Sequence, residues 1–82
     1  MTDPSDKYWR TPDIYLAAFL YARGAIIVGV EKIEGKPIYS FIDSAQRRLW
    51  DTEYHTGKPL VDVRLFVYAL RDLLSKSRQS LR

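Results

Sequence analysis

The hydrophobic and polar positions of the chain predict the order helix, strand, strand, helix, helix. An almost continuous apolar run at 14–22 follows Thr11-Pro12-Asp13, which is a typical helix start, and Gly24 stands where a left-handed stop is expected. A helix that is apolar on nearly all sides must be covered on more than one of them. The pattern therefore predicts a first helix that ends near Arg23 and lies deep in the fold.

Two short segments rich in β-branched and aromatic residues, at 25–30 and 37–42, flank the turn signal Glu34-Gly35. They predict a two-stranded antiparallel hairpin. A two-residue turn sets a register that pairs Val30 with Tyr39, Gly29 with Ser40, Val28 with Phe41, and Ile27 with Ile42. Both faces of this hairpin are then apolar, and the small Gly29–Ser40 pair leaves a shallow place where another element can approach closely.

The second half of the chain predicts two more helices. Asp43 is the expected N-cap of the first, with Arg47 and Arg48 on its outward face and Gly57 at its end. Asp62 is the expected cap of the last helix, which runs to about residue 76 with apolar residues at helical spacing. The predicted fold class is α+β, with one helix, a two-stranded hairpin and two further helices.

The 82 residues allow a single domain. Charged and polar residues fill most of 1–10, so we expect a mobile N-terminal segment there, whose two aromatic residues, Tyr8 and Trp9, can pack back onto the domain. The domain is expected at 11–76, and 77–82 form a basic C-terminal end.

Three helices and one hairpin do not offer enough cover for so apolar a first helix and two apolar sheet faces. We therefore expect a homodimer, in which a second copy covers this surface or completes the sheet. The predicted interface takes residues from the first helix and from the hairpin: Tyr15, Phe19, Ile27, Gly29, Ser40 and Ile42.

Charge is unevenly distributed. The chain holds 13 basic and 10 acidic side chains, a formal charge of +3, and the excess lies after residue 72. Such an end either complements the helix dipole or contacts phosphates or an acidic partner. If the last two helices pack antiparallel, their cations share one surface. The candidate nucleic-acid contacts are Arg47, Arg48, Lys76, Arg78 and Arg82, and such contacts to DNA or RNA are weak and salt-dependent.

Few residues offer catalytic or metal chemistry. The chain has no Cys and one His, His55, which stands four residues after Asp51 without further ligands nearby. We expect no metal site, no cofactor and no enzymatic activity. The longest apolar runs are too short to span a bilayer, and the polar start is unlike a secretory signal, so we expect a cytoplasmic protein that does not enter membranes.

The run Asp13–Leu20, Gly24, Val30-Glu31, Phe41 and Val61-Asp62 resembles a family of short bacterial and phage-associated proteins known only as a domain of unknown function. The resemblance spans about residues 11–76. It implies a free-standing cytoplasmic domain from a phage or mobile element, and it brings no site residues.

Two functions follow as expectations. The first is a small non-catalytic accessory or regulatory protein that contacts nucleic acid through its basic C-terminal helix. The alternative is a protein-interaction module, such as an inhibitor, an adaptor or an assembly subunit, that uses an apolar helix or sheet face.

Overall fold

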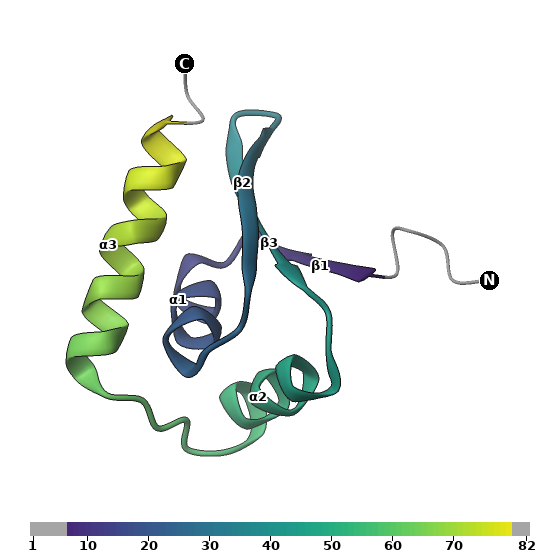
Figure 1. Ribbon diagram of the computed structural model, residues 1–82, viewed down its shortest axis with the longest axis vertical. Coiled ribbons are helices and arrows are strands. Elements are labelled where there is room, and N and C mark those ends of the chain that lie inside the picture. Colours follow the sequence, from purple (N-terminus) through teal and green to yellow (C-terminus); the bar gives the residue numbers. More distant parts are fainter. Residues whose placement is uncertain (1–6, 80–82) are drawn as a thin grey trace.

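The computed structural model describes residues 7–79 and confirms the α+β class (Figure 1). The predicted helices and hairpin are present, and a further strand precedes them. The elements are β1 (Tyr8–Thr11), α1 (Ile14–Arg23), β2 (Ile27–Ile33), β3 (Lys36–Ile42), α2 (Ala45–Thr56) and α3 (Val63–Gln79).

The sheet has three antiparallel strands in the order β1-β3-β2, instead of the predicted two. The added strand comes from the segment predicted to be mobile, because Tyr8 pairs with Ile42 and Trp9 with Phe41. The two rings of the second pair lie 6.2 Å apart. The prediction is therefore wrong for residues 8–10, whereas residues 1–6 lie outside the described part. At the other end, residues 77–79 belong to α3.

The hairpin turn forms as predicted. Glu34 and Gly35 have φ angles of 52° and 81°, the left-handed pair that a tight two-residue hairpin turn requires. The pairs Val30–Tyr39 and Gly29–Ser40 are confirmed.

Beyond Gly29 the predicted register is wrong. A bulge makes Val28 the extra residue, so Ile27 pairs with Phe41 in place of Ile42. Ile27 then packs against the core, and Val28 is 53% exposed. The run Ile26-Ile27-Val28 has no polar alternation, so the sequence does not indicate which of its residues face the core.

Local side-chain hydrogen bonds set the helix starts. The Asp13 carboxylate accepts from the backbone N–H groups of Tyr15 and Leu16, and Gly24 ends α1 with a φ of 112°. Ser44, and not the predicted Asp43, caps α2 by accepting from the Arg47 N–H at 3.0 Å. This frees the Asp43 carboxylate for another role.

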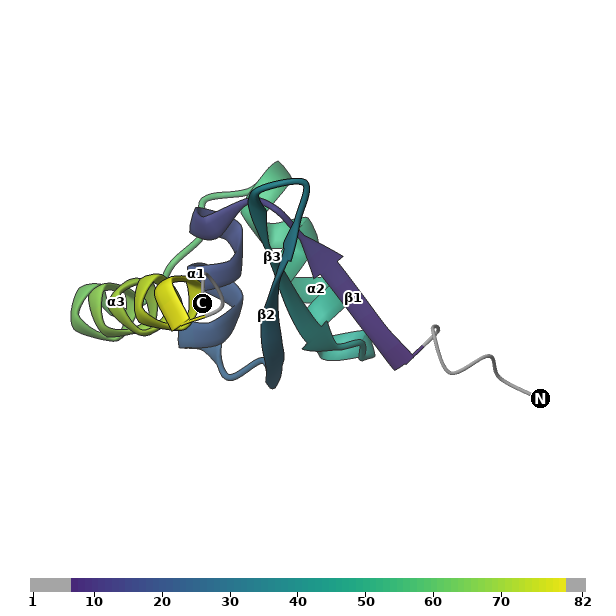
Figure 2. The ribbon, with the colours of Figure 1, turned by 90° about the horizontal axis from the view of Figure 1, so that it is seen from above.

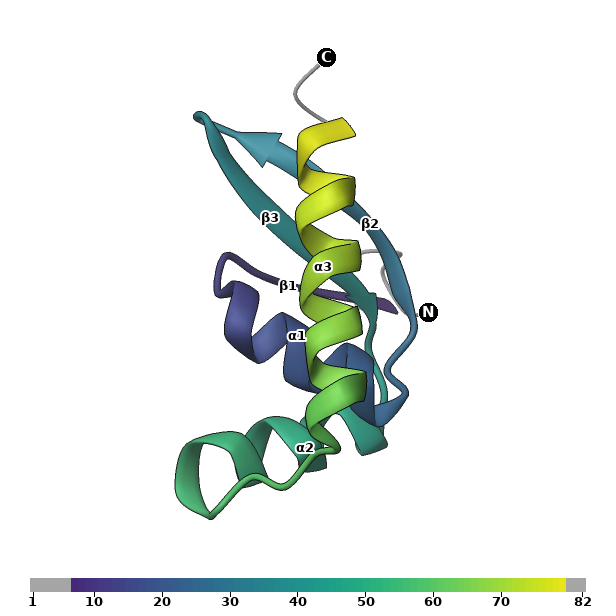
Figure 3. The same ribbon diagram turned by 90° about the vertical axis from the view of Figure 1, so that its left-hand side faces the viewer.

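Helix α1 lies in the centre of the fold, between α3 and the sheet and next to α2 (Figures 1 and 3). Its Ala17, Ala18 and Leu20 are fully buried. The other core residues are Leu16, Phe19, Tyr39, Phe41, Ala69 and Leu73. The chain therefore covers its apolar first helix without a second copy, contrary to the expectation from its sequence.

The two faces of the sheet differ. Figure 2 shows α1 and α3 on the same side of the sheet, against the face that holds Tyr39 and Phe41. The opposite face, which we call the outer sheet face, carries Tyr8, Arg10, Gly29, Glu31, Ile33, Ile38, Ser40 and Ile42 by strand alternation.

Candidate interaction surface

Arg47, predicted to contact phosphates, is buried and only 4% exposed. Its Nε donates to Asp43 at 2.9 Å and its Nη1 donates to Asp51 at 3.0 Å. The guanidinium carbon lies 4.2 Å from the centroid of the Trp9 ring. Arg47 therefore forms buried ion pairs with two carboxylates and a cation–π contact with an aromatic ring, and these contacts hold the fold together. The prediction that Arg47 lies on an outward surface and contacts phosphates is wrong.

The remaining predicted cations do not form one patch. The Arg48 side chain is 62% exposed and lies 3.4 Å from Asp43, and the Lys76 ammonium lies 3.2 Å from Asp72. Helix α2 lies at one end of the molecule, and the C-terminal end of α3, with Arg78, lies at the other (Figures 1 and 3). The antiparallel pairing that would have brought these cations onto one surface does not form, because both helices pack on α1. Arg82 lies outside the described residues.

Two of the six predicted interface residues face the core, and a third, Ser40, is buried on the outer sheet face. Phe19 is a core residue, 2% exposed, and its ring lies 5.4 Å from that of Tyr54. Ile27 packs against the core, and Ser40 is 4% exposed. The prediction missed this because it assumed that α1 lacked cover and that the hairpin had no bulge.

The other three predicted interface residues lie on two separate surfaces: Tyr15 on α1, and Gly29 and Ile42 on the outer sheet face. Tyr15 is 59% exposed on α1, whereas Ile42 is 37% exposed on the outer sheet face. Gly29 lies on that face too, with no atom within 4 Å of the position that a Cβ would take. An ion pair between Arg10 and Glu31, 3.7 Å long, joins the two strands that flank β3 on this face. The outer sheet face is therefore partly polar, with an ion pair across its middle strand.

Helix α3 carries the largest group of exposed apolar side chains on one element. Val63 is 75% exposed, Leu65 51%, Tyr68 62% and Leu74 42%. Two of them, with the half-buried Val67 and Leu70, follow one another at spacings of four, three and four residues. We call these four residues the apolar strip: Val63, Val67, Leu70 and Leu74.

Beside the apolar strip runs a line of three exposed arginines at intervals of seven residues. This arginine row consists of Arg64, Arg71 and Arg78. At 100° per residue, the row lies roughly opposite the buried Leu73 around the helix, so it faces away from the core. Only Arg78 was predicted as a site residue. The seven-residue spacing was readable in the sequence once the helix was assigned.

The arginine row has no acidic counterpart. None of the residues three or four positions from each arginine is acidic, so no pair within the helix can form. Among residues 7–79, no ion pair joins any of the three to another element. The row therefore presents three uncompensated positive charges.

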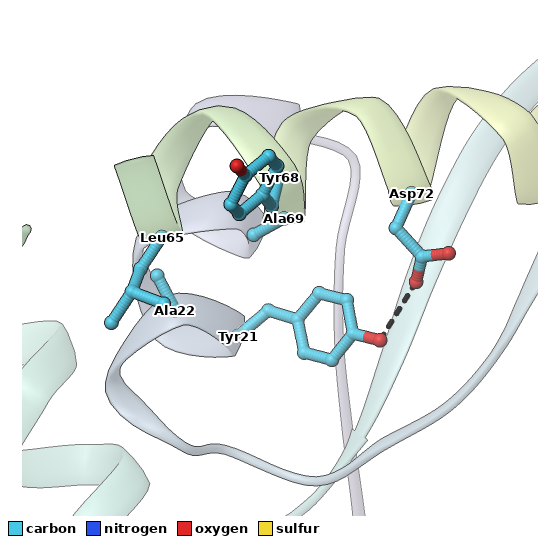
Figure 4. Close-up of a pocket in the computed structure, with 6 residues that line it drawn as sticks. All are labelled: Tyr21, Ala22, Leu65, Tyr68, Ala69 and Asp72. Atoms are coloured by element: carbon cyan, nitrogen blue, oxygen red, sulfur yellow. Dashed lines mark hydrogen bonds between the residues drawn. The ribbon is translucent and has the colours of Figure 1, made fainter. Parts of the chain in front are cut away.

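On the other flank of α3, a shallow pocket of about 270 Å³ opens towards the end of α1 (Figure 4). Its lining residues are Tyr21, Ala22, Leu65, Tyr68, Ala69 and Asp72. The Tyr21 hydroxyl donates to the Asp72 carboxylate at 2.7 Å, which raises the pKa of Tyr21 and lowers the pKa of Asp72. This hydrogen bond joins α1 to α3 and occupies the most polar part of the pocket.

We expect Tyr21→Phe to lower the free energy of unfolding by about 1 kcal/mol at neutral pH, because a hydrogen bond to a charged acceptor is lost. The pKa of Asp72 is lowered in the fold, so this stabilisation is present above the ordinary pKa of the carboxyl and is lost as the pH falls through the lowered value. Urea unfolding at a series of pH values should show the difference from the unmodified protein shrinking below about pH 4.

Tyr68→Phe is the matched control, because this side chain lines the same pocket and is 62% exposed. It should leave stability unchanged within about 0.5 kcal/mol. An equal loss for Tyr21→Phe at neutral and acidic pH would contradict a charge-dependent bond.

His55 and Asp51 form the pair that their spacing indicates. The His55 Nδ1 lies 3.0 Å from an Asp51 carboxylate oxygen and 2.9 Å from its backbone oxygen. The other carboxylate oxygen of Asp51 accepts from Arg47. Within the described residues, no group of three or more potential ligands assembles a metal site.

Residues 7–79 form an α+β domain, and within these residues no helix packs on the outer sheet face or on the side of α3 that carries the arginine row (Figures 2 and 3). No family model, curated protein or solved structure matches the chain. The resemblance to short bacterial and phage-associated proteins stays a prediction. No helix within residues 7–79 combines the length and the apolar character needed to cross a bilayer.

Proposed function

We propose that this protein is a non-catalytic protein-interaction module that binds its partner through the outward side of α3. The observation that carries the proposal is the exposure of four large apolar side chains on a single helix, at 42–75% each, with Val63 and Leu74 on one flank of the arginine row and Leu65 and Tyr68 on the other. Apolar side chains gathered on one element of a small domain are a feature of protein-binding surfaces.

The position of α3 supports this choice. Figure 3 shows α3 in front of the rest of the fold, with its outward side towards the viewer. Its inward side packs through Ala69 and Leu73, which are 7% and 0% exposed. A partner can therefore bind along the helix without disturbing the core.

The test is affinity capture with the immobilised protein from an extract of the cells that produce it. We expect one retained protein whose capture is lost with the double variant Val63→Ser/Leu74→Ser. Both side chains are exposed, so the variant should keep its fold, which circular dichroism checks.

The matched control is Tyr8→Ser/Leu49→Ser, which removes two apolar side chains exposed at 42% and 55% on β1 and α2. It should capture the same protein as the unmodified chain. Capture that the α3 variant leaves intact, or retained material that disappears after nuclease treatment, would contradict the proposal.

Nucleic-acid binding is the second candidate, and the arginine row is the observation that favours it. Three uncompensated guanidinium groups along one helix suit phosphate contacts that are weak and lose affinity steeply with salt. The neighbouring apolar strip has no counterpart on a phosphate backbone, and for this reason we place this function second. Titration of labelled DNA and RNA at low and moderate salt tests it.

A homodimer also stays a prediction, and the outer sheet face is the surface that we propose for it. This face carries Tyr8, Ile33 and Ile42 at 37–48% exposure. Light scattering at micromolar concentration tests the prediction, and a monomer would contradict it.

A further inference from the structure

We propose that the partner segment bound by α3 is an amphipathic helix with acidic residues at seven-residue intervals, which pairs with α3 as in a two-stranded coiled coil. The inference rests on the proposed function and adds the chemistry of the partner. It follows from the register of the apolar strip, from the charge of the arginine row, and from the charge repulsion that would arise if α3 paired with a second copy of itself.

The register is that of a coiled-coil seam. The apolar strip places Val63, Val67, Leu70 and Leu74 at alternating spacings of four and three residues, which brings them to one side of a helix. Val63 and Leu74, at the two ends of the strip, are 75% and 42% exposed, and the two residues between them are half-buried. Leu70 also packs against the core of the domain. A second helix lying along this seam would therefore cover Val63, Val67 and Leu74 and the exposed part of Leu70.

The charge beside the seam specifies the partner. In this register Arg64 and Arg71 directly follow the strip residues Val63 and Leu70, and Arg78 follows Ser77, where the seam would continue. Such a flanking position contacts charged residues of the neighbouring helix. The three arginines lie about 10.5 Å apart along the axis, since a helix rises 1.5 Å per residue. Carboxylates at the same interval on the partner would compensate each of them.

A second copy of α3 does not meet this requirement. In an antiparallel pair, equivalent flanking positions face each other, so arginine would face arginine. In a parallel pair, Arg71 and Arg78 would face the positions held here by Phe66 and Leu73, and Leu73 is fully buried in the core. Arg64 would face Pro59, which precedes the helix. Neither arrangement supplies a carboxylate, so the observations favour an acidic partner of different sequence.

The test mixes the full-length protein with labelled helical peptides of three heptads and measures their binding by fluorescence anisotropy. One peptide has apolar seam residues and Glu at the flanking positions, and its match has Lys in place of each Glu. We expect saturable binding of the Glu peptide only. The variant Arg64→Gln/Arg71→Gln/Arg78→Gln should weaken it about tenfold, because three partly exposed ion pairs are lost.

Arg48→Gln is the charge control, because this arginine is 62% exposed on α2. It should leave affinity for the Glu peptide unchanged. Equal binding of the Glu and Lys peptides, or no effect of the triple variant, would overturn the inference. Binding of a labelled DNA duplex without binding of the Glu peptide would also overturn it, and would favour the nucleic-acid candidate.

Failure of the inference is distinguishable from failure of the proposed function. If Val63→Ser/Leu74→Ser still abolishes capture of a partner while the Glu peptide does not bind, the interaction module stands and the acidic helix is excluded. If capture is independent of α3, the proposed function itself fails.

Discussion

Replacing Arg47 by alanine should lower the free energy of unfolding by about 3 kcal/mol, because two carboxylates then lose their shared cation. The Asp43 and Asp51 side chains are 19% and 26% exposed, so water compensates them only in part. The substitution also removes the cation–π contact between the Arg47 guanidinium and the Trp9 ring. For a domain of this size, such a loss is a large part of the total stability. Urea denaturation at neutral pH measures it.

Arg48→Ala is the control for this prediction. It removes the same charge from the next position of α2, where the side chain is 62% exposed. We expect a change within about 0.5 kcal/mol. If the two variants lose similar stability, the buried ion pairs of Arg47 do not hold the fold in the way that we infer.

Trp9→Ala should cost about 3 kcal/mol, because the ring packs against the core from β1 and touches Phe41 and Arg47. The loss should be coupled to that of Arg47→Ala. In the double variant we expect about 1 kcal/mol less than the sum of the two single losses, since both remove the same cation–π contact. Denaturation followed by circular dichroism measures all three.

Tyr8→Ala is the matched control, because Tyr8 is the preceding residue and is 42% exposed on the outer sheet face. It should cost about 1 kcal/mol or less. A mobile N-terminal segment, as the sequence suggested, predicts instead that neither variant changes stability. A negligible effect of Trp9→Ala would therefore argue against β1 as part of the sheet.

Features that depend on local chemistry could be predicted from the sequence. The Glu34-Gly35 turn, the Gly24 stop and the apolar spacing of α3 each follow from a few neighbouring residues. Asp62 was likewise expected as a cap, and its carboxylate accepts from the backbone N–H of Arg64 at 2.9 Å.

Features that depend on residues far away in the sequence could not be predicted from it. Nothing near Trp9 in the sequence indicates that β3 lies beside it, and nothing near Arg47 indicates that its guanidinium packs on the Trp9 ring. The bulge at Val28 is also set by packing, because its neighbours are equally apolar. The candidate site was misplaced for the same reason: the relative positions of α2 and α3 depend on α1, which separates them.

The strand order has a consequence for how the protein is made. Because β1 pairs with β3, β1 has no neighbouring strand during synthesis until residues 39–42 have left the ribosome, and Trp9 has no cation until α2 follows. Synthesis proceeds at roughly 5–20 residues per second, which is slow compared with helix formation. The nascent chain therefore passes through a period in which the apolar residues of α1 have been made but are not yet covered by α3, and such exposed apolar residues are what chaperones bind.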